Sequence, residues 1–122
     1  MKKMFFPTLL LALIGACDDA KAPAGNPEAV AAAEQVWTAK CVTCHGKGGA
    51  GDGEAGKVLK PPPRNFANSS WQGSVDDAHL RKIIIEGGAA VGLSANMSAN
   101  PELADKPEVV EALVQKIRGF KS

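Results

Sequence analysis

The sequence contains few aromatic residues and no large excess of charge of either sign. Among its 122 residues there is no tyrosine, and there are only four phenylalanines and two tryptophans. Lysine and arginine together number 14, and aspartate and glutamate 13, so the chain lacks the basic excess that would favour nucleic-acid binding. So few aromatic residues make a thin core for a domain of this size.

Signatures of several other protein classes are missing as well. No alternating strand pattern, internal repeat or block of like charge appears, so the helical periodicities predict an all-α fold. A glycine-rich stretch at 46–56 does not end in Gly-Lys-Ser/Thr, which excludes a P-loop. No nucleophile–base pair or carboxylate dyad is apparent, so the sequence does not favour an enzyme.

Only three cysteines occur, and two of them belong to the motif Cys-Val-Thr-Cys-His at 41–45. Cys-x-x-Cys-His is the attachment signature of a covalently bound haem of the c type. Positions three apart lie on the same face of a helix, so Cys41 and Cys44 can form thioethers with the two vinyl groups of one porphyrin. His45 can then ligate the iron. The motif predicts one covalent haem c, whose apolar surface would supplement the thin core.

Two other interpretations of the motif fit less well. A redox dithiol of the thioredoxin type belongs in a strand–helix context without this histidine, and no strand pattern leads into Cys41. A structural zinc site needs four ligands, and outside the motif only Cys17 and His79 remain, at unsuitable spacing.

Residues 1–16 have the pattern of an export signal, with a basic start, an apolar run and small residues. The run is too short to span a bilayer permanently. The stretch ending at Cys17 resembles the lipobox of bacterial lipoproteins, which implies cleavage before Cys17 and a lipid on its sulfur. An ordinary secretory peptide cut after Ala22 is the alternative. The composition of residues 17–27 predicts a flexible tether. The tether would connect a domain at 28–122 to a bacterial membrane, on its periplasmic or outer side.

Apolar residues at spacings of three and four predict three main helices, over about 27–40, 75–86 and 107–118. Asn26 and Ser74 are the expected N-caps of the first two helices. A short helical turn is expected where Asn-Pro occurs, at 100–101. The expected buried positions are Val30, Ala33, Trp37, Leu80, Ile83, Ile84, Val110, Leu113, Val114 and Ile117.

The order of these parts resembles the small class I cytochromes c: a first helix, the Cys-x-x-Cys-His motif, a glycine loop, a helix, a methionine loop and a last helix. The resemblance covers about 28–120 and implies the small cytochrome c fold, with three main helices around one covalently bound haem. In that family a small and an aromatic residue on the first helix cross the last helix, and Ala33 and Trp37 match these places. Leu113 and Ile117 match their apolar partners, whereas Lys116 stands where relatives often carry an aromatic.

Met97 lies in a loop at 87–100 that resembles the family's loop bearing the second axial ligand. A thioether suits haem iron, and His/Met ligation raises the reduction potential. The other two methionines belong to the expected signal peptide, so Met97 is the one that would remain. Ser98, which follows it, departs from the proline of many relatives. His79, expected on the second helix, is the competing ligand.

The segment Pro-Pro-Pro-Arg-Asn-Phe at 61–66 is similar to the segment beneath the proximal histidine in the same family. There a proline carbonyl accepts a hydrogen bond from the imidazole and fixes its tautomer, which implies this role for Pro62 or Pro63. Arg64 resembles the residue that meets a haem propionate, a role that its planar side chain suits; a solvated surface charge is the alternative. Trp71 could also reach a propionate, or simply pack.

With His45 and Met97 on the iron, no position stays open for oxygen or peroxide. The sequence therefore predicts a one-electron carrier that moves electrons between membrane or periplasmic redox proteins. Docking would be transient, with Lys47, Lys57 and Lys60 as candidate contacts. Two alternatives remain: a haem-bearing subunit of a respiratory oxidase or reductase complex, and a gas-sensing or peroxidatic haem protein if Met97 dissociates easily.

Overall fold

The structure is a computed structural model that describes residues 25–122. The expected signal peptide at 1–16, the expected lipidation site Cys17 and the tether up to residue 24 lie outside the described residues. From residue 25 onward all regular structure is helical and no strand occurs, which confirms the all-α prediction. Within the same range, no helix combines the length and apolar character needed to cross a membrane.

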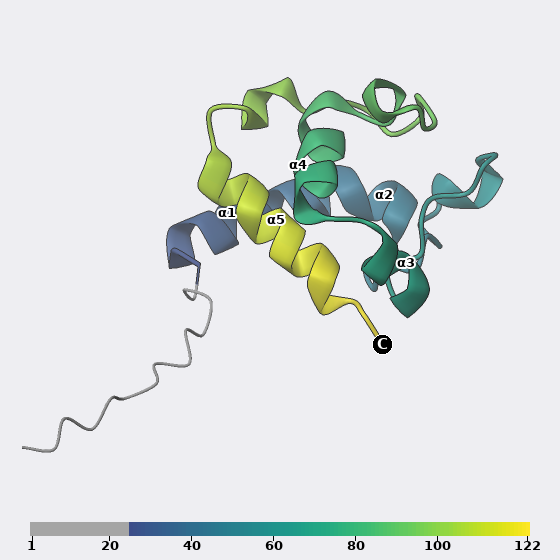
Figure 1. Ribbon diagram of the computed structural model, residues 1–122, viewed down its shortest axis with the longest axis horizontal. Helices are drawn as coiled ribbons and strands as arrows, with labels where there is room; N and C mark the ends of the chain where they lie inside the picture. The colour runs from purple at the N-terminus through teal and green to yellow at the C-terminus, as the bar shows by residue number, and fades with distance from the viewer. Residues whose placement is uncertain (1–24) are drawn as a thin grey trace, which may run out of the picture.

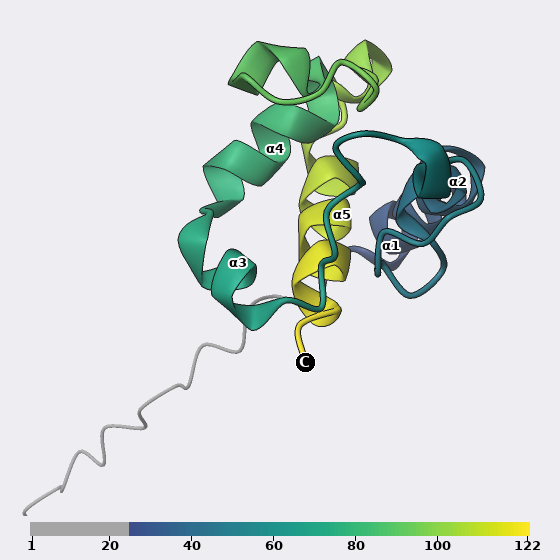
Figure 2. The same ribbon diagram turned by 90° about the vertical axis from the view of Figure 1, so that its right-hand side faces the viewer.

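Three helices form the body of the domain: α1 (Pro27–Val36), α4 (Asp77–Glu86) and α5 (Pro107–Gly119). Figure 1 shows α5 lying across α1. The perpendicular view in Figure 2 shows α5 between α4 on one side and α1 with its continuation on the other. The buried core is formed by Ala33, Trp37, Phe66, Leu80, Ile84, Leu103, Val110, Leu113, Val114 and Ile117.

The first helical segment begins as predicted but extends further. The side chain of Asn26 accepts a hydrogen bond from the Glu28 amide at 3.0 Å, and proline takes the first helical position, where an N–H would have no helical partner. The chain continues through a π-helical turn, η1 (Trp37–Cys41), into α2 (Val42–His45). The expected helix end near residue 40 is therefore wrong, and the Cys-x-x-Cys-His motif lies on a continuation of the first helix.

The crossing of α1 and α5 is formed by the small, aromatic and branched side chains that the sequence predicted. Ala33 and Trp37 on the first helical segment are 2% and 3% exposed. Leu113 and Ile117 on α5 are 1% and 6% exposed, and the two helices are in direct contact. The crossing is thus a dry contact of the kind that resists any change of side-chain volume.

The prediction for Val30 is wrong. Its side chain is 48% exposed, whereas that of Ala29 is only 6% exposed. Ala29, Ala33 and Trp37 are spaced by four residues and follow one row on the helix surface. That row belongs to the packed side of α1, and Val30 lies outside it.

Lys116 completes the crossing in spite of its charge. Its Nζ atom lies 2.7 Å from a carboxylate oxygen of Glu34, on α1. The same Nζ lies 5.4 Å from the ring centre of Trp37 and 5.7 Å from that of Phe120. Cation–π attraction and the aliphatic stem of lysine allow it to pack on aromatic faces, so the departure from an aromatic residue at this place does not open the crossing.

A short helix that the sequence pattern did not indicate, α3 (Ser69–Ser74), precedes α4. The Asn68 side chain accepts a hydrogen bond from the Trp71 amide at 2.8 Å and caps its first turn. The Ser74 hydroxyl donates to the Trp71 carbonyl at 2.8 Å. Ser74 therefore belongs to the end of α3, and its predicted role as the N-cap of α4 is wrong.

The actual N-cap of α4 is Asp76. Val75 is extended, with φ −122° and ψ 141°, so it separates the two helices. The Asp76 carboxylate accepts a hydrogen bond from the His79 amide at 2.7 Å. The helix accordingly begins at Asp77 rather than at residue 75, and it ends at Glu86 as predicted.

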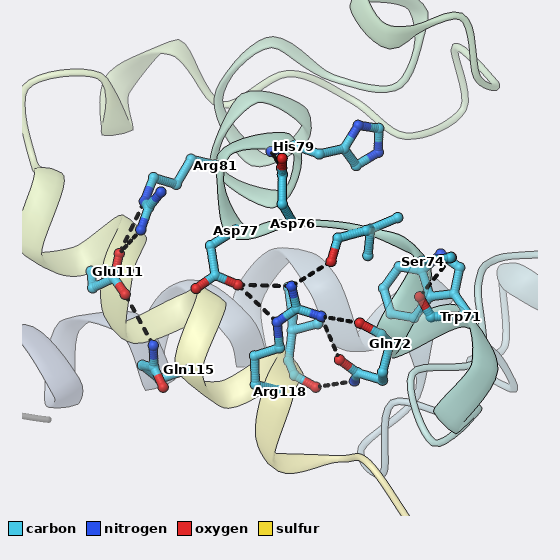
Figure 3. Close-up of polar contacts among 12 residues, drawn as sticks. Trp71, Gln72, Ser74, Asp76, Asp77, His79, Arg81, Glu111, Gln115 and Arg118 are labelled. Carbon is cyan, nitrogen blue, oxygen red and sulfur yellow. Dashed lines mark hydrogen bonds and ion pairs between the residues drawn. The ribbon is translucent and has the colours of Figure 1, made fainter. Parts of the chain in front are cut away.

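Arg118, near the end of α5, holds α3 and α4 against α5 (Figure 3). Its guanidinium donates to the carbonyl and side-chain oxygens of Gln72 at 2.7 and 2.9 Å, and to the Val75 carbonyl at 2.7 Å. A fourth bond of 2.8 Å reaches a carboxylate oxygen of Asp77. One arginine thus satisfies the backbone acceptors at the junction of the two helices, which the geometry of a five-donor fork permits.

Candidate cofactor site

The three side chains of the motif lie on one helical turn at the end of the first helical segment. Cys41 is the last residue of η1, and Cys44 and His45 belong to α2. Both cysteines are free thiols and partly buried. Burial raises the pKa of Cys41 to about 11, against a smaller opposing effect of the Lys40 charge. At neutral pH the Cys41 side chain is therefore a neutral thiol.

The glycine-rich loop closes the end of this turn. The last four carbonyls of a helix lack partners within it, and here each of those from 42 to 45 accepts a backbone N–H at 2.8–3.1 Å. The donors, in the same order, are Gly46, Ala55, Gly53 and Gly51. A Cβ atom on Gly53 would lie 2.4 Å from the Thr43 carbonyl oxygen, so only glycine permits this approach. These hydrogen bonds therefore hold the loop against the carbonyl end of the helical turn that contains the motif.

His45 is buried, with 9% of its surface exposed. The Phe66 ring is stacked on its imidazole, with ring centres 4.5 Å apart and an angle of 17° between the planes. Nδ1 lies 3.3 Å from the Arg64 carbonyl oxygen. Because a carbonyl can only accept, Nδ1 carries the proton and Nε2 keeps its lone pair.

The surroundings of His45 also favour the neutral imidazole that a metal requires. Burial lowers its pKa, and the hydrogen bond to the Arg64 carbonyl opposes this effect only in part. A neutral, oriented ring with a free Nε2 is the form in which histidine ligates metals.

The prediction that the carbonyl of Pro62 or Pro63 accepts this hydrogen bond is wrong, because the acceptor is the next carbonyl along the chain. The Pro63 carbonyl points elsewhere: a Cβ atom on Gly51 would lie 2.5 Å from its oxygen. Arg64 thus orients the His45 ring through its backbone carbonyl. Its side chain is exposed, and its guanidinium carbon lies 5.7 Å from the ring centre of Trp71.

The loop that contains Met97 is folded back onto the end of α4. The Gly88 amide donates to the Met97 carbonyl at 2.9 Å. Further along the loop, the Asn100 amide donates to the Ile85 carbonyl at 2.9 Å, and its buried side chain donates to the Ile84 carbonyl at 2.8 Å. Hydrogen bonds at two places therefore hold the loop to the end of α4. The Met97 side chain remains partly exposed.

Gly87 makes the turn into this loop possible. Its φ of +82° is a conformation that favours glycine, and a Cβ atom there would lie 2.9 Å from both the Ala99 nitrogen and the Met97 carbonyl oxygen. The competing histidine, His79, lies in the first turn of α4, and the Met97 loop follows the last turn. The two candidate ligands are thus associated with opposite ends of one helix.

The donor set fits a haem of the c type. Two thiols and a neutral imidazole share one closed helical turn, and Met97 is the only methionine among residues 25–122. In cytochromes c an imidazole and a thioether ligate the haem iron, and the two cysteines of Cys-x-x-Cys-His attach the porphyrin.

A comparison with protein-family models agrees with this chemistry. The model described as "Cytochrome C oxidase, cbb3-type, subunit III" matches residues 28–117. The chain belongs to this family. It is therefore a c-type cytochrome domain, and its function is haem-based electron transfer. A search of curated proteins found no significant match.

Two contributors to the site were missed at the level of sequence. Phe66 ends the proline segment at 61–66, and no spacing rule links its ring to His45. The backbone role of Arg64 has no sequence signal, because every residue type carries the same carbonyl.

Proposed function

We propose that the protein is a one-electron carrier that holds a single haem c, bound covalently through Cys41 and Cys44. The observation that carries the proposal is the closed turn from Cys41 to His45, with two free thiols and a buried neutral imidazole. When bound, the haem supplies one-electron exchange between Fe(III) and Fe(II). The membership of the chain in a cytochrome c family supports the same chemistry.

His45 and Met97 are the proposed axial ligands. His45 is oriented by the Phe66 ring and the Arg64 carbonyl, and these contacts set the direction of its Nε2. The double attachment of the Met97 loop to α4 supports a fixed position for the thioether. With both positions taken, the domain would retain its ligands in both oxidation states and offer no open site to oxygen or peroxide.

Arg64 is the proposed partner of a haem propionate. Its guanidinium is exposed and forms no ion pair with any carboxylate of residues 25–122. A planar guanidinium with unused donors suits a carboxylate group.

Redox partners are proposed to dock transiently. Of the three lysines expected to guide them, Lys57 is paired with Glu54 at 2.7 Å, so its charge is partly compensated. Lys47 and Lys60 form no ion pair within residues 25–122. They are the better candidates for steering an acidic partner, and an electron-transfer rate that does not fall with added salt would exclude them.

Export and lipid anchoring are proposed from the sequence pattern alone. Cleavage before Cys17 and a lipid on its sulfur would tether the domain, through residues 17–27, to a bacterial membrane on its periplasmic or outer side. The intact mass of the protein purified from membranes tests this proposal, because an unmodified chain beginning at Met1 would contradict it.

A second function, as a fixed subunit of a respiratory oxidase, is favoured by the description of the matching family. The same site would serve both roles. Purification in mild detergent distinguishes them, because a subunit brings stoichiometric partners with it and a carrier elutes alone.

The decisive test of the proposed function is a pyridine haemochrome spectrum together with the intact mass. One haem c per chain, with the mass of polypeptide plus one haem, is the expected result. A colourless protein with the mass of polypeptide alone would refute the proposal. Carbon monoxide binding to the reduced protein tests the gas-sensing or peroxidatic alternative, because a firmly held Met97 should resist it.

A further inference from the structure

A continuous series of aromatic rings connects His45 with the surface. Phe66 is stacked on the imidazole at 4.5 Å, and its ring centre lies 5.3 Å from that of Trp71 and 6.4 Å from that of Phe120. Phe66 is 6% exposed, whereas Trp71 and Phe120 are half-buried. The series thus runs from the proposed iron ligand, through one buried ring, to two rings that reach solvent.

Positive charge flanks the outer rings. Lys121 directly follows Phe120, and Lys47 lies in the turn that packs against the same ring, since a Cβ atom on Gly49 would lie 2.7 Å from it. Both lysines are exposed, and neither forms an ion pair with a carboxylate of residues 25–122. Asp52 packs against this turn. A third lysine, Lys116, lies 5.7 Å from the Phe120 ring centre but is paired with Glu34.

We propose that Trp71, Phe120, Lys47 and Lys121 form a docking surface, the aromatic face, for an acidic patch on a redox protein that carries one electron. Phe66 would connect this face with His45. The inference rests on the proposed function, because it requires haem iron at His45. In the transfer, the reduced metal centre of the partner would lose one electron, and haem iron held at His45 would gain it. No bond forms or breaks, and no proton moves.

Each part of the aromatic face has a separate physical role. The two lysines would attract an acidic partner and raise the encounter rate, an effect that salt weakens. The half-buried aromatic residues would supply the dry central contact, in which such side chains are enriched at protein interfaces. Phe66 would then connect the docked partner with His45, since its ring contacts both the imidazole and the outer rings.

Voltammetry of the haem-loaded protein on gold tests the proposal. A carboxylate-terminated monolayer represents the acidic partner, and the amount adsorbed, the reduction potential and the interfacial electron-transfer rate are all measured. The double variant K47Q/K121Q should weaken adsorption at low salt by about tenfold or more. Lys82→Gln is the control for the single variants Lys47→Gln and Lys121→Gln, because Lys82 is an exposed lysine of α4 without an ion pair among the described residues, and it should leave adsorption unchanged.

The aromatic part is tested on the same electrode. Trp71→Leu should reduce the electron-transfer rate severalfold while the potential and the amount adsorbed stay the same. Trp71→Phe should retain most of the rate, because it keeps a ring beside Phe66. A merely structural role of Trp71 would instead alter the potential or the haem spectrum.

Two results would overturn the proposal: an unchanged transfer rate in Trp71→Leu, or unchanged adsorption of K47Q/K121Q. If Trp71→Leu fails to retain haem, two measurements still test the proposal. They are the electron-transfer rate of Trp71→Phe relative to the parent protein and the adsorption of the lysine variants. The absence of any voltammetric wave from the parent protein would refute the proposed function itself, so the two failures are distinguishable.

Discussion

The amide of Gly88 donates a hydrogen bond of 2.9 Å to the carbonyl of Met97. This bond closes the methionine loop onto the end of α4, next to the turn that Gly87 makes. The thioether is therefore carried by a segment whose backbone is organised locally, whereas His45 is organised by residues far from it in the sequence. The two proposed ligands thus depend on different kinds of structure, and substitutions can separate them.

Met97→Ala should abolish the ferric thioether charge-transfer band and lower the reduction potential, because a soft ligand that favours Fe(II) is lost. His79→Ala is the matched control, and it should change neither property, since His79 lies at the other end of α4. Absorption spectra and voltammetry of the two purified variants check the prediction. An unchanged spectrum in Met97→Ala would refute the assignment.

Gly87→Ala should destabilise the protein and weaken the Met97 ligation, because its Cβ atom would lie 2.9 Å from the Met97 carbonyl oxygen. Gly92→Ala separates the two causes: Gly92 also has a positive φ, +75°, but nothing lies within 4 Å of its Cβ position. Gly92→Ala should lower the free energy of unfolding by about 1–2 kcal/mol, through backbone strain alone. Urea unfolding and the charge-transfer band report both effects, and equal losses in the two variants would show that the close approach is unimportant.

Arg118→Met should lower the free energy of unfolding by about 1–3 kcal/mol, because backbone acceptors of Gln72 and Val75 lose their donor. Arg81→Met makes the same substitution at another arginine, whose partner, Glu111, is a surface carboxylate. Because exposed ion pairs contribute little, this control should hardly shift the urea midpoint. Similar shifts for both variants would contradict the role assigned to Arg118.

Cys41→Ala and Cys44→Ala should each leave one thioether, and the double variant none. Under denaturing conditions, the single variants should therefore keep haem on the polypeptide and the double variant should release it. Haem staining of denaturing gels and intact masses measure this directly. Haem that stays bound to the denatured double variant would contradict attachment through these two sulfurs.

Helix α5 and the crossing with α1 were predictable because their apolar residues recur with helical spacing. Ala33, Trp37, Leu113 and Ile117 all lie in the buried core as expected. Val30 was not predictable in the same way: it satisfies the spacing rule as well as Ala29 does, and only the position of α5 decides which of the two is covered.

The boundary between α3 and α4 was not predictable, because several residues compete for the same role. Asn68, Ser74 and Asp76 are all good N-caps in isolation. Asn68 and Asp76 each cap a helix, and Ser74 does not. The backbone between the two helices is bound at Gln72 and Val75 by Arg118, from a helix more than forty residues away in sequence.

The sequence by itself determined the donor set and the class of cofactor. The spacing of two thiols and an imidazole on one helical turn, with a lone methionine in a distant loop, requires no knowledge of tertiary contacts, because helix geometry alone places the three on one turn. The tertiary structure decided how these donors are held: the Arg64 carbonyl beside His45, the Phe66 ring on its face, and the aromatic series that reaches the surface. Such contacts join segments that only the packing of the chain brings together. Contacts made by backbone carbonyls and ring faces also produce no periodic pattern in a sequence.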